Sequence, residues 1–183
     1  MQELATIVAG ACSARGLALR PDLHEPGWTF WELRTLNRHR VVGLVRPTVP
    51  AGSATALETD VRGALSRNFR RAWWRGLACG VVVEGTPDAW TPADLTPMVD
   101  VHERNVAIIQ WIVGTGTGRN RAIAMHTWEE VWLSPVYRGT VQALEAEGVN
   151  VARAVRQKDG LMRLLTGASQ VAGVQFPDFH DSP

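Results

Sequence analysis

The side chains best suited to chemistry gather between Arg67 and Gly85, where a basic segment runs through two adjacent tryptophans into an apolar run. The candidate contacts for an anion or a nucleic acid are Arg67, Arg70, Arg71, Trp74 and Arg75. Guanidinium groups match the geometry of phosphate, and an indole can stack on a base. Asp60 shares the predicted helix face, however, and an amphipathic helix must turn charged groups toward water. We therefore expect a solvated outer face, with nucleic-acid contact as the alternative.

A second candidate set lies on the predicted strand Arg121–Leu133. Strand alternation places Ile123, Met125, Val131 and Leu133 on one face, which we expect the helices to cover. The other face carries His126, Trp128, Glu130 and Trp132, and Trp111 of the neighbouring strand joins it if the register allows. Such a face would suit a ligand groove, proton transfer by His126 with Glu130, or a protein interface. We expect the interface, because large exposed aromatic surfaces are usually covered by more protein.

Two further motifs carry less chemistry. Asp100 and His102 are spaced for one strand face with Glu103 beside them, but a metal needs three or four convergent ligands, so we expect neither a metal nor a cofactor. Residues 114–121 are rich in glycine, yet they join two predicted strands rather than a strand and a helix N-terminus. We expect a flexible hairpin tip, from which Arg119 and Arg121 would reach a polyanion or a partner.

Nucleophilic catalysis has no support in the sequence. No serine stands in a G-x-S-x-G context, and neither Cys12 nor Cys79 has an evident histidine partner. We expect both cysteines to be buried, reduced thiols and the protein not to be an enzyme.

Composition narrows the class of protein. The chain has 183 residues, 45% of them hydrophobic, and a net charge of +1, so no overall charge draws it to nucleic acid or membrane. Eight tryptophans against one tyrosine is a bias that favours interfaces. Residues 1–14 lack the features of a signal peptide, and no apolar run approaches the ~20 residues of a membrane span. We expect a cytoplasmic protein without membrane association.

The hydrophobic patterns predict the elements that position these residues. They are a helix over 2–17, a hairpin of strands 28–35 and 40–46, a helix from Thr55 through Trp73, a strand over 77–84 covered on both faces, a long hairpin of 106–113 with 121–133, a helix capped by Ser134 and ended by Gly148, and a last helix from Asp159. Residues 149–155 fit either an edge strand or a helix.

Together these patterns predict a single α+β domain over residues 1–175, followed by a tail at 176–183. We expect a largely antiparallel sheet of about five or six strands, with the helices packed on one face. The predicted function is a non-enzymatic binding or adaptor domain that uses its tryptophan-bearing sheet face for self-association or for a protein partner. The alternative is a nucleic-acid-associated protein that uses the arginine-rich helix 62–75 and the hairpin tip 114–121.

Overall fold

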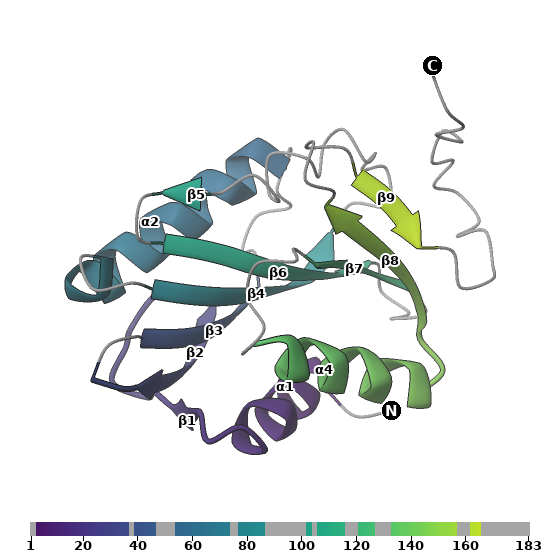
Figure 1. Cartoon of the computed structure of the whole chain (residues 1–183), viewed down its shortest axis with the longest axis horizontal. Coiled ribbons are helices and arrows are strands. Elements are labelled where there is room, and N and C mark those ends of the chain that lie inside the picture. Colours follow the sequence, from purple (N-terminus) through teal and green to yellow (C-terminus); the bar gives the residue numbers. More distant parts are fainter. Residues whose placement is uncertain are drawn as a thin grey trace.

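A mixed β-sheet runs through the computed structural model, which describes residues 3–36, 39–46, 54–73, 77–86, 102–103, 106–115, 121–126, 133–156 and 162–165 (Figure 1). Its nine strands follow the order β1-β2-β3-β4-β6-β7-β8-β9, with β5 paired to β6. The strands are β1 (Ala18–Leu19), β2 (Trp28–Arg34), β3 (His39–Val45), β4 (Leu77–Thr86), β5 (His102–Glu103), β6 (Val106–Thr115), β7 (Arg121–His126), β8 (Asn150–Arg156) and β9 (Met162–Leu165).

Two consecutive ββαβ units build most of this sheet. In the first, the antiparallel pair β2–β3 is followed by α2 (Ala54–Trp73) and by β4, which lies parallel to β3. In the second, the antiparallel pair β6–β7 is followed by α4 (Ser134–Ala146) and by β8, which lies parallel to β7. The parallel pairing of β4 with β6 joins the two units.

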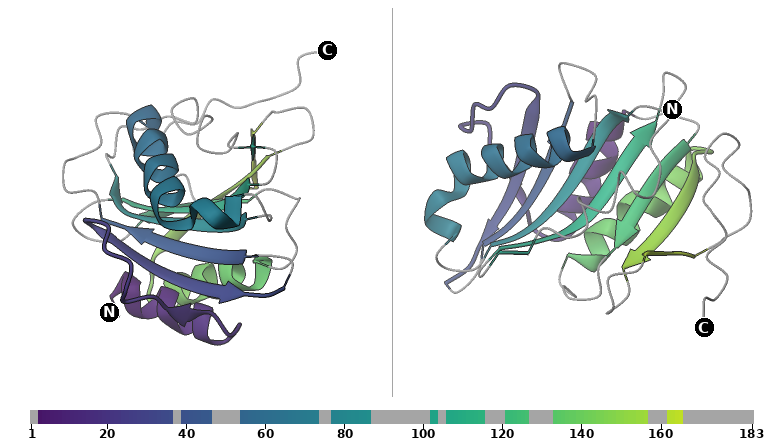
Figure 2. Two further views of the ribbon diagram at one scale, coloured as in Figure 1. Left: turned by 90° about the vertical axis from the view of Figure 1, so that its left-hand side faces the viewer. Right: turned by 90° about the horizontal axis from the view of Figure 1, so that it is seen from above.

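This topology decides which face each helix covers. Both crossovers advance in the same direction across the sheet, but β7 runs antiparallel to β6 and therefore opposite to β3. Since crossovers between parallel strands are right-handed, two crossovers from oppositely directed strands place their helices on opposite faces. Figure 2 shows this arrangement, with α2 on one side of the sheet and α4, together with α1 (Leu4–Ser13), on the other.

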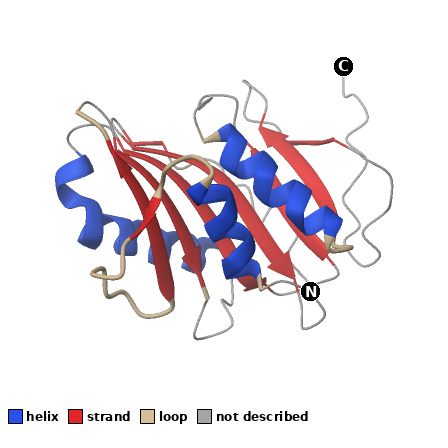
Figure 3. Ribbon diagram, turned by 90° about the horizontal axis from the view of Figure 1, so that it is seen from below, coloured by secondary structure: helices blue, strands red, loops and turns tan. Residues whose placement is uncertain are grey.

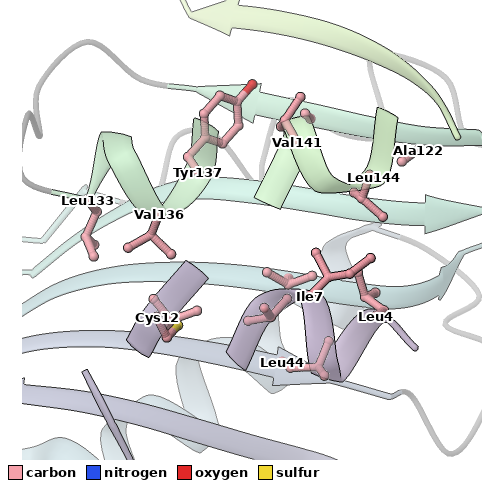
Figure 4. Packing of buried hydrophobic residues seen from close by; sticks show 14 of the residues in the cluster. Leu4, Ile7, Cys12, Leu44, Ala122, Leu133, Val136, Tyr137, Val141 and Leu144 are labelled. Atoms are coloured by element: carbon pink, nitrogen blue, oxygen red, sulfur yellow. The ribbon is translucent and has the colours of Figure 1, made fainter. Parts of the chain in front are cut away.

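The face that carries α1 and α4 holds a large buried cluster. The two helices lie side by side (Figure 3) and approach closely, since a Cβ on Gly139 of α4 would lie only 3.6 Å from the Cβ of Ala11 in α1. Apolar side chains of both helices form one buried cluster with Trp31, Leu44 and Ala124 of the sheet. Figure 4 shows part of this cluster, with Leu44 labelled on the sheet. Small residues thus let the helices meet while their larger side chains reach the strands.

The opposite face packs against α2. Its apolar stripe of Leu57, Val61, Leu65 and Phe69 is buried, as the spacing predicts. The ring of Phe69 meets Phe30 edge to face at 5.3 Å between centroids, and Phe30 stacks on Trp28 at 5.2 Å. Gly43 makes room for this aromatic group, because a Cβ there would lie 2.7 Å from the Trp28 ring.

Several predicted elements are confirmed. They include the α+β class, the first helix, the β2–β3 and β6–β7 hairpins, and the end of α4, where Gly148 has φ +80°. The strand Leu77–Val83 is buried along its whole length, as expected of a central strand covered on both faces. Residues 150–156 form a strand between β7 and β9 rather than a helix or an edge.

Other expectations are wrong. The sheet is mixed rather than largely antiparallel, and within the described residues it has nine strands rather than five or six. The described helices lie on both faces of the sheet rather than on one. Within the last predicted helix, residues 162–165 instead form β9, because β8 leaves a free edge with which they pair. Leu133 rather than Ser134 occupies the N-cap of α4. The predicted tail at 176–183 lies outside the described residues, and the single domain over 1–175 stays a prediction.

The tight packing around Gly43 can be tested by a matched pair of glycine substitutions. Gly43→Ala should lower the free energy of unfolding by about 1–3 kcal/mol, because the new methyl group overpacks the aromatic group. Gly10→Ala should raise it by about 0.5–1 kcal/mol, since Gly10 lies inside α1 with nothing within 4 Å of an added Cβ. Urea unfolding measures both, and equal midpoints for the two variants would contradict this packing.

Candidate functional site

The basic set on α2 is divided by a break in the helix. Phe69 has non-helical backbone angles, φ −122° and ψ 26°, in the middle of the arginine-rich stretch. Arg67 therefore precedes the break and Arg70 follows it, so the two arginines do not belong to one uninterrupted helical face. The buried ring of Phe69 holds this kink against the sheet.

Arg67 is already engaged by a carboxylate. Its Nε and terminal nitrogen donate to the two oxygens of Glu25, at 3.2 and 2.5 Å, and Asn68 donates to the same carboxylate at 3.0 Å. The hydrogen bond from Arg67 lowers the pKa of Glu25, and the same bond raises the pKa of Arg67. This arginine is thus largely neutralised by a partner from the loop before β2.

The remaining basic candidates are placed only in part. Arg70 is exposed and makes no ion pair within the described ranges, whereas Arg62, one turn before Arg67, is bonded to Glu58 at 2.8 Å. Arg71 lies in the last turn of α2, and Arg121 opens β7 opposite Thr115 of β6. Trp74, Arg75 and Arg119 lie outside the described residues.

The strand register separates two members of the predicted tryptophan-bearing face. Trp111 pairs with Met125, whereas His126 pairs with Gln110. Residues that pair directly across strands share a face, and neighbours along a strand alternate, so positions 111 and 126 fall on opposite faces of the sheet. Trp128, Glu130 and Trp132 follow the end of β7 and lie outside the described residues.

Position 126 of β7 lies on the same sheet face as Ala122 and Ala124, because side chains alternate along a strand. Ala122 and Ala124 are buried in the cluster under α1 and α4. Ile123, on the other face of the strand, is 4% exposed and is not in that cluster. Leu133 does belong to it, so Ile123 and Leu133 do not form one strand face as alternation had predicted.

A buried charged cluster joins β2, β3 and the segment after β1. The carboxylate of Glu32, whose side chain is 8% exposed, pairs with Arg20 and lies 3.1 Å from Nδ1 of His39. Arg20 also donates to both oxygens of Asp22, at 2.9 and 2.7 Å. Sequence reasoning did not select this cluster, although a glutamate on the same strand face as the apolar Trp28 and Phe30 was a signal for it.

The contact with Arg20 changes the pKa of Asp22. The hydrogen bond from Arg20 lowers the pKa of Asp22 from 3.8 to about 2. A carboxylate whose pKa is lowered by folding stabilises the folded state at pH values above its pKa in the unfolded chain. The contribution of Asp22 to stability is therefore present at neutral pH and is lost as the pH falls from about 4 to about 2.

Buried nucleophilic groups stay protonated. Burial raises the pKa of Cys12 to about 12 and also raises the pKa of Cys79, so neither thiol forms a thiolate near neutral pH. Both are free and buried, which confirms the expectation of structural thiols. Burial likewise raises the pKa of Tyr137 to about 12, with its ring against the α1–α4 cluster.

The sheet edge that carries β1 and the β2–β3 hairpin exposes large apolar side chains. Leu36 at the hairpin turn is 96% exposed, and Leu19 of β1 is 53% exposed. A hollow of about 210 Å³ lies between α1 and the start of the hairpin, lined by Ala5, Gly27, Trp28, Thr29, Leu44 and Arg46. Binding pockets for small molecules usually enclose roughly 300–1,000 Å³, so this hollow is small for an organic ligand.

No group of three or more metal-ligating side chains occurs within the described part of the chain. The same residues contain no helix that is both long and apolar enough to span a bilayer. Comparison with protein-family models, with curated proteins and with solved structures finds no match to this chain.

The charged cluster can be tested by two glutamine substitutions. Glu32→Gln should lower the free energy of unfolding by about 1–3 kcal/mol, because Arg20 loses the charge of a largely buried carboxylate partner. Glu145→Gln is the control, since Glu145 pairs with Arg153 on the surface, where loss of an ion pair costs at most about 1 kcal/mol. Urea unfolding at pH 7 measures both, and equal losses would show that the Glu32 cluster contributes no more than a surface pair.

Proposed function

We propose that this chain is a protein-binding domain that self-associates through the sheet edge formed by β1 and the β2–β3 hairpin. The observation that carries the proposal is the exposure of Leu36 and Leu19 at this edge, 96% and 53%. Burying a leucine side chain fully is worth about 1.5–3 kcal/mol, and both residues could contribute on association.

The backbone at this edge supports self-association in particular. β1 is the terminal strand of the sheet, so its outer N–H and C=O groups face away from β2. An edge strand is a template for pairing with another strand, and a second copy supplies the same strand in a self-complementary twofold arrangement. Arg34, exposed at the end of β2, would lie at the polar rim of such an interface.

The predicted interface of His126, Trp128, Glu130 and Trp132 stays part of the proposal as a second contact surface. Its support is the enrichment of tryptophan, a residue that combines a large apolar body with a polar N–H. Trp111 would not share this surface with His126 if the strand alternation holds.

The nucleic-acid alternative has less support. Arg67 and Arg62 both contact carboxylates, and Asp60 lies exposed on the same helix. A phosphate-binding surface needs arginines that are not already compensated, and Arg70 is the clearest such residue in the described part of α2.

Sedimentation equilibrium tests the proposed edge. The wild-type protein should form a dimer that persists in about 0.5–1 M salt, because the contact is apolar and only interactions between exposed charges are screened at this concentration. Leu36→Glu should weaken the dimer about tenfold or more, since a charge would have to be desolvated at the interface. Gln142→Glu, at an exposed position of α4, is the matched control and should leave the dimer unchanged.

Two results would speak against this function. A wild-type protein that stays monomeric at high concentration would exclude self-association through any surface. A dimer that Leu36→Glu leaves intact, or absorbance at 260 nm that salt removes, would move the interaction to the tryptophan-bearing segment or to the arginines of α2, respectively.

A further inference from the structure

The segment between Leu17 and Trp28 differs from the rest of the first ββαβ unit in how it is held. Leu17 and Trp28 are 4% and 8% exposed, but each of the ten residues from Ala18 to Gly27 is either exposed or only partly buried. The segment nevertheless runs along the outer edge of β2 and supplies β1, the last strand on that side (Figure 1). It covers the sheet edge without contributing a side chain to the core.

Two sets of charged contacts fasten this segment. At one point Arg20 pairs with the buried carboxylate of Glu32 and with Asp22. At the other, Glu25 accepts from Arg67 and Asn68 of α2. Each set joins a residue of the segment to a different element, β2 in the first case and α2 in the second.

Backbone hydrogen bonds complete the attachment. Beyond the two-residue pairing of β1, the N–H of Arg20 donates to the carbonyl of Phe30 at 2.9 Å, and the N–H of Trp28 donates to the carbonyl of Glu25 at 3.0 Å. At the end of the segment, the N–H of Arg46 donates to the carbonyl of Gly27 at 2.7 Å. Few hydrogen bonds and little buried apolar surface are the features of regions that open locally at low free-energy cost.

We propose that residues 18–27 form a strap over the β2 edge that is fastened mainly by charge and opens while the rest of the fold stays closed. Opening frees the Phe30 carbonyl and the backbone groups of β2 that pair with β1. These groups then become available to an incoming strand, so the strap controls access to the sheet edge. The proposal concerns the isolated chain and does not depend on its self-association.

Salt should act on this strap more than on the core. Solvent ions reach the Glu25–Arg67 contact more readily, because the side chain of Arg67 is 59% exposed, whereas at the other contact Arg20 is 32% exposed and the Glu32 carboxylate only 8%. Salt screens exposed ion pairs, whereas apolar burial under α1, α2 and α4 is not weakened by screening. The strap should therefore become easier to open in salt that leaves the central strands closed.

Amide hydrogen exchange followed by NMR tests the proposal on the full chain, at concentrations where it is monomeric. The amides of Arg20 and Trp28 should exchange faster than that of Val81 in β4, which reports opening of the whole sheet. Glu25→Gln should speed exchange at Arg20 and Trp28 about two- to fivefold without changing it at Val81, the effect expected for one partly exposed ion pair. Glu145→Gln, which removes an ion pair remote from the strap, should change neither.

A salt series on the wild-type protein gives a second readout that requires no substitution. Raising sodium chloride from low to about 1 M should accelerate exchange at Arg20 and Trp28 relative to Val81. The proposal is overturned if the strap amides exchange at the rate of Val81 under all conditions. It is also overturned if Glu25→Gln accelerates all three amides equally, because the strap would then open only with global unfolding.

Discussion

The handedness of the two crossovers is the constraint on which the rest of the structure depends. β3 and β7 point in opposite directions, and both continue through a helix to the next strand on the same side. Right-handed connections then send α2 to one face and α4 to the other. Each unit covers one face of the sheet with its own helix. α1 packs beside α4 and extends the covering of that face over the strands of the first unit. The buried part of β4, Leu77–Val83, lies where the helices of both faces cover the sheet.

This architecture limits where a partner can be bound. In the first unit both sheet faces are occupied by helices, and the reactive groups there, such as the Cys79 thiol, are buried and protonated. What the first unit offers to the outside is its edge, where Leu19 and Leu36 are exposed and the chain is fastened by ion pairs rather than by core packing. The proposed contact surface and the proposed strap therefore concern the same region for the same physical reason.

Local patterns in the sequence predicted the elements better than their arrangement. The spacing of Leu57, Val61, Leu65 and Phe69 fixes a helix with one buried stripe, and the unbroken apolar run from Leu77 fixes a doubly covered strand. Strand direction is different, because it depends on which segments pair. The sequence of β7 alternates equally well whichever face the helix covers, so the choice between Ile123 and Ala124 as the residue facing α4 could not be made from periodicity.

The charged contacts could not be predicted from the sequence for a related reason. Arg67 read as part of a basic surface because its partner, Glu25, lies 42 residues earlier in the chain. Glu32 shares the face of Phe30, and its contacts with Arg20 and His39 join positions that local patterns do not connect. Long-range pairing of this kind leaves no periodic signal.

Nuclear Overhauser contacts from two adjacent residues test the two-sided arrangement most directly. Phe30 and Trp31 follow each other in β2, and the chain has four phenylalanines, so that few ring systems compete for the assignment of Phe30 and Phe69. The account predicts contacts from Phe30 to Phe69 of α2, at 5.3 Å between ring centroids, and from Trp31 to methyl groups of the α1–α4 cluster. Contacts from Phe69 to Trp31, or from Phe30 to the α1 methyl groups, would place the helices on one face and contradict the account.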